Sequence, residues 1–180
     1  MQHEVMFAGF GGQGILSSGK ILAHAAMEEG YQVVWIPSYG PEMRGGTAYC
    51  MVFISKKTIN SPVVRNPMHL VAMNRPSLEK FAPMIKPKGI ILINSSMIER
   101  RSGRDDVTEL TIPVNEIAKA LGDPKSANII ALAAFVAKSR MVSFDHLIES
   151  IRHEFMAKKD VLPVCLKAAE EGRKLGLANS

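Results

Sequence analysis

The stretch "FAGFGGQGIL" at residues 7–16 constrains the fold more than any other part of this sequence. The apolar run over residues 3–9 is typical of a buried strand, and a glycine stops it. Apolar and small residues then recur at helical spacing, which predicts a helix over about residues 12–28 that ends at Gly30. A second apolar run follows, so this region predicts a strand, a glycine turn, a helix and a strand, the first half of a parallel unit.

The glycines of this turn have the spacing found in phosphate-binding turns. Gly9, Gly11 and Gly14 match G-x-G-x-x-G directly after the predicted strand and at the start of the predicted helix. A backbone without side chains can turn tightly and approach a phosphate, and the N-terminus of a helix presents free N–H groups to an anion. The same glycines could instead serve only to let the strand and the helix pack closely. Both interpretations stay open.

A nicotinamide dinucleotide site would also need an acidic residue at the end of the second strand, where it would bind the ribose hydroxyls. The second predicted strand, over residues 31–37, ends in "VVWIPS" and contains neither Asp nor Glu. This counts against NAD, although a free-standing NAD- or FAD-binding oxidoreductase remains the alternative function.

The rest of the chain first alternates between strands and helices and then becomes helical. Strands are predicted at 47–55, 69–74, 90–94 and 107–113, and helices from Pro76 to near Phe81, at 114–122, at 126–139, after a Ser143 cap, and in a last segment ended by Gly176. Residues 61–64 fit either a hairpin strand or a loop. We therefore expect one α/β domain over residues 1–180, a three-layer α/β/α Rossmann-like fold with a mixed, mostly parallel sheet.

A second informative segment, "SYGPEMRGGTA" at residues 38–48, follows the second strand. Loops after parallel strands lie at the carboxyl edge of the sheet, so this segment should lie beside the glycine turn. Arg44 is suited to bind a phosphate or a carboxylate, and Gly45 and Gly46 remove side chains next to it. The alternative is an ordinary surface loop with a solvated arginine.

Composition excludes several classes of function. No apolar run approaches the roughly eighteen residues of a membrane span, and with no signal-type N-terminus we expect a cytoplasmic protein. The net charge of +5 is spread over small pairs without interleaved aromatics, which argues against nucleic-acid binding. Cys50 and Cys165 form no CxxC pair, so we expect no metal site or iron–sulfur cluster on this chain. The sequence also shows no recognisable pair of a nucleophile and a base, so no residue is assigned as catalytic. We therefore expect the chain to help form a site and not to perform chemistry alone.

The two segments together resemble the gamma subunit of the 2-oxoacid:ferredoxin (acceptor) oxidoreductases. The resemblance rests on "GFGGQGI" and "YGPEMRGGTA", on their separation and on the chain length, and it covers essentially the whole chain. The first motif is matched by Gly9, Gly11, Gly12, Gln13 and Gly14, and the second by Tyr39, Gly40, Pro41, Glu42, Arg44, Gly45 and Gly46. "MRGGTA" is more similar to the 2-oxoglutarate and branched-chain members than to the pyruvate members.

This resemblance implies a subunit of an enzyme that oxidatively decarboxylates a 2-oxoacid, with 2-oxoglutarate favoured, to acyl-CoA and CO2. It implies alpha, beta and often delta partner subunits, which hold thiamine diphosphate and the iron–sulfur clusters, and ferredoxin or a similar acceptor for the complex. The first motif and Arg44 would then lie on the coenzyme A side, and the rest of the second motif would form an interface or a ligand loop. A purely structural scaffold subunit is the remaining alternative.

Overall fold

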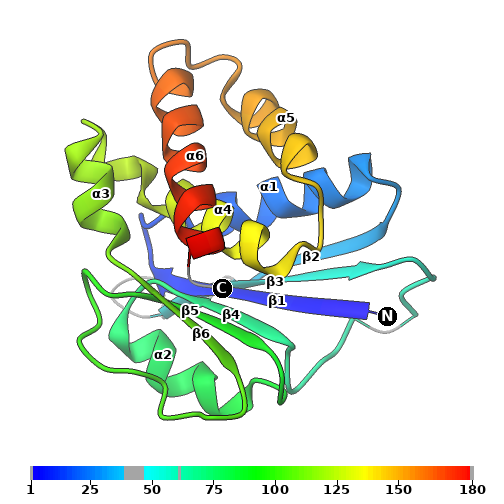
Figure 1. Cartoon of the computed structure of the whole chain (residues 1–180). Coiled ribbons are helices and arrows are strands. Elements are labelled where there is room, and N and C mark those ends of the chain that lie inside the picture. Colours follow the sequence, from blue (N-terminus) through cyan, green and yellow to red (C-terminus); the bar gives the residue numbers. More distant parts are fainter. Residues whose placement is uncertain (1, 39–46, 61, 179–180) are drawn as a thin grey trace.

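The computed structural model describes residues 2–38, 47–60 and 62–178. Over these residues it shows a six-stranded sheet in the order β2-β3-β1-β4-β5-β6, with helices on both faces (Figure 1). The strands are β1 (Gln2–Phe10), β2 (Gln32–Ser38), β3 (Thr47–Ser55), β4 (His69–Ala72), β5 (Ile90–Asn94) and β6 (Thr108–Ile112). The helices are α1 (Ile15–Glu28), α2 (Arg75–Phe81), α3 (Val114–Ala120), α4 (Ala127–Ser139), α5 (Phe144–Phe155) and α6 (Leu162–Ala178).

The sheet is mixed and mostly parallel, as expected from the sequence. β1, β4, β5 and β6 pair in parallel, whereas β3 runs antiparallel between β1 and β2. The expected parallel unit of β1, α1 and β2 is therefore split by β3. Alternate β3 side chains point to opposite faces, and Val52 and Phe53 are both almost fully buried, which suits a central strand.

Two apolar cores cover the two faces of the sheet. On one face, Phe7 and Leu92 pack with α1, α4 and α6, and on the other Met6 and Phe53 pack with α2. Figure 1 shows α2 alone on its side of the sheet, opposite α1 and α4–α6. None of the helices in the described ranges is both long and apolar enough to cross a bilayer.

Most predicted elements are confirmed, and the differences have local causes. α1 begins three residues later than expected, after Gly12 and Gly14 have taken positive φ values of 88° and 72°. β4 ends at Ala72 because Asn74 turns the chain and caps α2. The described residues 62–67 contain no strand, which favours a loop there. The Ser143 cap of α5 is confirmed, since its hydroxyl accepts a hydrogen bond from the His146 N–H.

The expectation that Gly176 ends the last helix is wrong. α6 continues to Ala178, and Gly176 is buried in it. A Cβ at this position would lie 2.3 Å from the carbonyl oxygen of Ala134 in α4, and one at Gly172 would lie 2.4 Å from that of Ile130. These glycines therefore allow close packing of two helices and do not mark a helix end.

Candidate functional site

The glycine turn lies at the carboxyl edge of the sheet, where two crossovers diverge. β1 and β4 are parallel neighbours, with Ala8 opposite Ala72. The chain leaves β1 for α1 on one face and leaves β4 for α2 on the other (Figure 1). In open α/β sheets, such a switch point forms the crevice in which ligands bind.

Gln13 fixes the conformation of the turn. Its backbone N–H donates to the Phe10 carbonyl over 3.2 Å, and its side-chain Oε1 accepts from the Phe10 N–H over 2.7 Å. Its Nε2 donates to the Met73 carbonyl, 3.3 Å away and just beyond β4. The side-chain amide therefore braces the turn against the neighbouring strand, a role that the glycine pattern itself does not reveal.

Gly9 and Gly14 approach the protein's own side chains. A Cβ on Gly9 would lie 2.5 Å from Gln13 Oε1, and one on Gly14 would lie 2.5 Å from Asn128 Nδ2 at the start of α4. Asn128 Nδ2 in turn donates to the Gly14 carbonyl at 3.2 Å. For these two positions, the close-packing interpretation holds.

Gly12 is different, and it leaves the turn open on its outer side. A Cβ there would have no atom of the described residues within 4 Å, and Gly11 and Gly12 are both exposed. The first bond of α1 runs from the Ser18 N–H to the Gly14 carbonyl, so the amides of residues 15–17 have no helical acceptor. Among the residues that the structure describes, no side chain caps α1, and no acidic residue occupies its first turn. The turn therefore offers backbone donors and a positive helix end to an anion.

The ends of β4 and β5 form a polar base beside the turn. Asn94, fully buried, donates to the Met73 carbonyl at 3.2 Å and to Asn115 Oδ1 at 2.7 Å. Asn74 accepts from the Ser77 N–H at 2.9 Å as the α2 cap, while its own Nδ2 is buried and has no hydrogen-bond partner among the described residues. These residues were not singled out from the sequence, although Asn before a helix with Pro in its first turn is a recognisable cap.

The second motif lies outside the described residues, so its side chains stay predictions: Tyr39, Gly40, Pro41, Glu42, Arg44, Gly45 and Gly46. The strands on either side of it are informative. Thr47 pairs with Phe10, at the start of the glycine turn, and Ser38 pairs with Tyr49 on β3. Both ends of the segment therefore lie at the same sheet edge as the turn.

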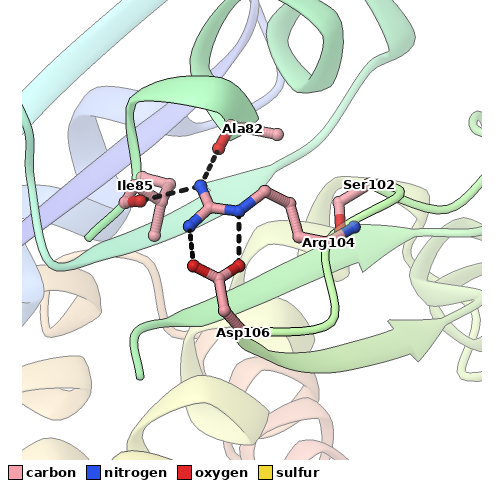
Figure 2. Close-up of polar contacts among 5 residues, drawn as sticks. All are labelled: Ala82, Ile85, Ser102, Arg104 and Asp106. Atoms are coloured by element: carbon pink, nitrogen blue, oxygen red, sulfur yellow. Dashed lines mark hydrogen bonds and ion pairs between the residues drawn. The ribbon is translucent and has the colours of Figure 1, made fainter. Parts of the chain in front are cut away.

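The loop that follows β5 crosses to the amino edge of the sheet, away from the glycine turn, and Arg104 holds it there (Figure 2). Its Nη1 donates to the carbonyls of Ala82 and Ile85 at 3.0 and 2.8 Å, and its Nε and Nη2 bind both oxygens of Asp106 at 2.6 Å. The hydrogen bonds from Arg104 hold the pKa of Asp106 below its usual value. Arg104 thus pairs with Asp106 and ties the loop to the residues that follow α2. The sequence around Asp105 and Asp106 is polar and Arg-rich, which is typical of a solvated loop and gives no sign of this contact.

Both cysteines are buried and protonated at neutral pH. Burial raises the pKa of Cys50 to about 12 and that of Cys165 to about 11. The Cys50 thiol donates to the Ile15 carbonyl at 3.4 Å, which makes it part of the packing beneath the turn. Neither thiol has the low pKa that a nucleophile or a metal ligand needs.

Comparison with known proteins places this fold among oxidoreductase subunits. The sequence pattern of the pyruvate ferredoxin/flavodoxin oxidoreductase family matches residues 4–175. Ketoisovalerate oxidoreductase subunit VorA of Methanothermobacter thermautotrophicus is 39% identical over 98% of this chain, which spans only 37% of VorA. 2-Oxoglutarate synthase subunit KorC of Methanocaldococcus jannaschii is 34% identical over 84% of this chain and 82% of its own.

Two solved structures share the fold. The gamma subunit of a keto/oxoacid ferredoxin oxidoreductase from Geobacter sulfurreducens has a TM-score of 0.86 and 29% identity, covering 98% of this chain and 99% of its own. The 2-oxoglutarate:ferredoxin oxidoreductase of Magnetococcus marinus, with 2-oxoglutarate, coenzyme A and succinyl-CoA bound, has a TM-score of 0.89 and 27% identity, covering 98% of this chain and 31% of its own. The chain therefore belongs to the pyruvate ferredoxin/flavodoxin oxidoreductase family, and it matches the gamma subunits of the 2-oxoacid:ferredoxin oxidoreductases.

Proposed function

We propose that this chain is the gamma-type unit of a coenzyme A-dependent 2-oxoacid:ferredoxin oxidoreductase, and that its glycine turn faces coenzyme A. The complex would convert a 2-oxoacid to acyl-CoA and CO2. The alpha, beta and delta partners that the resemblance implies would hold thiamine diphosphate and the iron–sulfur clusters. The role of this chain is then to complete the site and the assembly.

One observation carries the proposal: the outer side of the turn at Gly11 and Gly12 is open and rich in backbone donors at a switch point. Coenzyme A is polyanionic, so its phosphates fit free amides and a positive helix end. Arg44 would supply a bidentate donor from the adjoining segment, whose two ends lie at the same edge.

The substrate is proposed to be either 2-oxoglutarate or a branched-chain 2-oxoacid. The "MRGGTA" sequence supports both, and the relatives named above are a ketoisovalerate and a 2-oxoglutarate enzyme subunit. Rates of the reconstituted complex with 2-oxoglutarate, 2-oxoisovalerate and pyruvate would decide between them. Pyruvate as the fastest substrate would contradict this assignment.

The test of the glycine turn uses Gly12→Asp, with Gly30→Asp as its matched control. Both glycines have a positive φ, 88° and 83°, and a Cβ at either would meet nothing within 4 Å. The two variants therefore carry the same strain and the same added charge, but Gly30 lies at the opposite edge. In the co-expressed complex, we expect the KM for coenzyme A to rise about tenfold or more in Gly12→Asp alone.

Equal KM values for coenzyme A in the two variants would contradict binding at the turn.

Arg44→Ala should likewise weaken coenzyme A binding or subunit assembly, and no change in either would remove Arg44 from the site. Full coenzyme A-dependent activity of the partner subunits without this chain would contradict the subunit role. Tight stoichiometric NADH binding by the isolated chain would favour the alternative of a free-standing nucleotide-binding oxidoreductase.

A further inference from the structure

A cavity lies between the helices, far from the glycine turn. It has a volume of about 330 Å³ and is lined by the ends of α1, α4, α5 and α6. α1 runs back from the carboxyl edge, so Glu29 at its end lies near Gln32, which starts β2 at the amino edge of the sheet. Whatever this cavity binds is thus separate from the site proposed above.

Two arginines at this cavity differ from most of the other arginines in their lack of an ion pair with a described residue. Five arginines pair with carboxylates: Arg75, Arg100, Arg101, Arg104 and Arg152. Arg140 and Arg173, which both line the cavity, form no ion pair with any of the described residues. Two guanidinium groups at one cavity, neither in an ion pair within the described part of the chain, favour the binding of an anion.

The one carboxylate in the cavity wall is already bound. Glu29 Oε2 accepts from the Ser143 N–H at 2.7 Å and lies 3.5 Å from His146 Nδ1. It therefore joins the end of α1 to the start of α5, and it forms no ion pair with either of these two arginines.

Much of the remaining cavity wall is apolar, and one of its side chains contacts an arginine. The Arg173 guanidinium lies 4.6 Å from the centre of the Phe144 ring, a cation–π contact that holds the guanidinium over the ring. Val136 and Val142, both buried, line the cavity as well. The cavity thus combines paired positive charge with an apolar surface.

We propose that this cavity binds a small organic oxyanion, with its phosphate or carboxylate between Arg140 and Arg173 and its apolar body against Phe144. Guanidinium groups bind both kinds of headgroup by paired N–H donors. The site is independent of the proposed coenzyme A surface, because the two lie at opposite edges of the sheet.

The test titrates the full chain with phenyl phosphate and, separately, with benzoate at constant ionic strength, following the backbone amide NMR shifts of Ala137 and Phe144. We expect saturable binding with a Kd of about 1 mM or lower for at least one probe, and the stronger probe identifies the headgroup. Arg140→Gln and Arg173→Gln should each weaken binding about tenfold. Arg152→Gln, which removes a paired arginine of α5 outside the cavity, should leave it unchanged.

Two further variants keep the test decisive. Arg140→Lys retains the charge but loses the paired donors, so its affinity should lie between those of the unaltered chain and Arg140→Gln, and an equal loss in the lysine and glutamine variants would overturn the assignment to an anion. In Gly12→Asp, the shifts of Ala137 and Phe144 should saturate as in the unaltered chain, whatever either probe does at the glycine turn, and loss of these shifts would place the anion at the turn and overturn the proposal. Absence of saturable shifts for both probes would also overturn it.

Discussion

The buried imidazole of His69 should make the stability of this protein depend on pH. His69 is only 4% exposed, and its Nδ1 accepts the Ile90 N–H at 3.1 Å, which fixes the proton of the neutral ring on Nε2. Burial, and then the charges of His3 and Lys86, lower the pKa of His69 from 6.5 to about 4. Protonation of Nδ1 would also break the bond to Ile90, so the folded state strongly favours the neutral ring.

The magnitude follows from the two pKa values. The unfolded chain takes up the His69 proton near pH 6.5, whereas the folded chain does so only near pH 4, so stability falls as the pH drops between them. At about 1.36 kcal/mol per pKa unit, the loss reaches roughly 3 kcal/mol by pH 4. That is a large part of a typical unfolding free energy of about 5–15 kcal/mol.

Urea unfolding between pH 7.5 and 4.5 of the unaltered chain and of His69→Asn measures this effect. Asparagine keeps an acceptor for the Ile90 N–H but does not titrate, so the stability difference between the two proteins should change by about 2–3 kcal/mol across the range. Leu70→Ala, a neighbouring core change, should lower stability by a similar amount at every pH. Parallel curves for the unaltered chain and His69→Asn, or an NMR titration of His69 near pH 6.5, would refute the reasoning.

Three other changes test the packing and the polar contacts. Gly176→Ala should push α6 away from Ala134 and lower the free energy of unfolding by about 1–3 kcal/mol, which lowers the Tm by about 2–4 °C per kcal/mol. An unchanged Tm would mean that the two helices are not closely packed at this position. Arg104→Lys keeps the charge beside Asp106 but loses the two-pronged contact, so it should lower the urea midpoint, and equal midpoints would mean that this contact does not contribute to stability. Asn128→Ala should cost about 1–2 kcal/mol by removing the side-chain amide that bonds the glycine-turn carbonyl, and hydrogen exchange of the α1 amides should become faster; unaltered exchange would contradict this.

The elements of the fold could be predicted because their signals are local. The β1 strand, the helix that follows the glycines and the apolar run of β5 are each encoded within about ten residues. The place of β3 between β1 and β2 could not be predicted, because strand order depends on contacts between distant residues. Glycine in the last helix was misleading for a similar reason, since the residue that requires Gly176 is Ala134, in another helix.

The position of the candidate site could be predicted from the sequence, but the contacts of its residues could be predicted only in part. The spacing of glycines located the turn, yet it could not distinguish Gly9 and Gly14, which contact the protein, from the open Gly12. The brace by Gln13 depends on the Met73 carbonyl, sixty residues away, and no local pattern records it.

The sheet is assembled from two separate stretches of chain. Residues 2–55 contain β1, β2 and β3, and residues 69–112 contain β4, β5 and β6. Within the sheet the two stretches meet along the β1–β4 ladder, whose register runs from Val5 to Ala8, and the contacts of Gln13 with Met73 and of Lys86 with Glu4 join them as well. The glycine turn lies at the end of this ladder, next to the contact between Gln13 and Met73. A molecule bound at the turn is therefore expected to stabilise the junction of the two stretches as well as the turn itself.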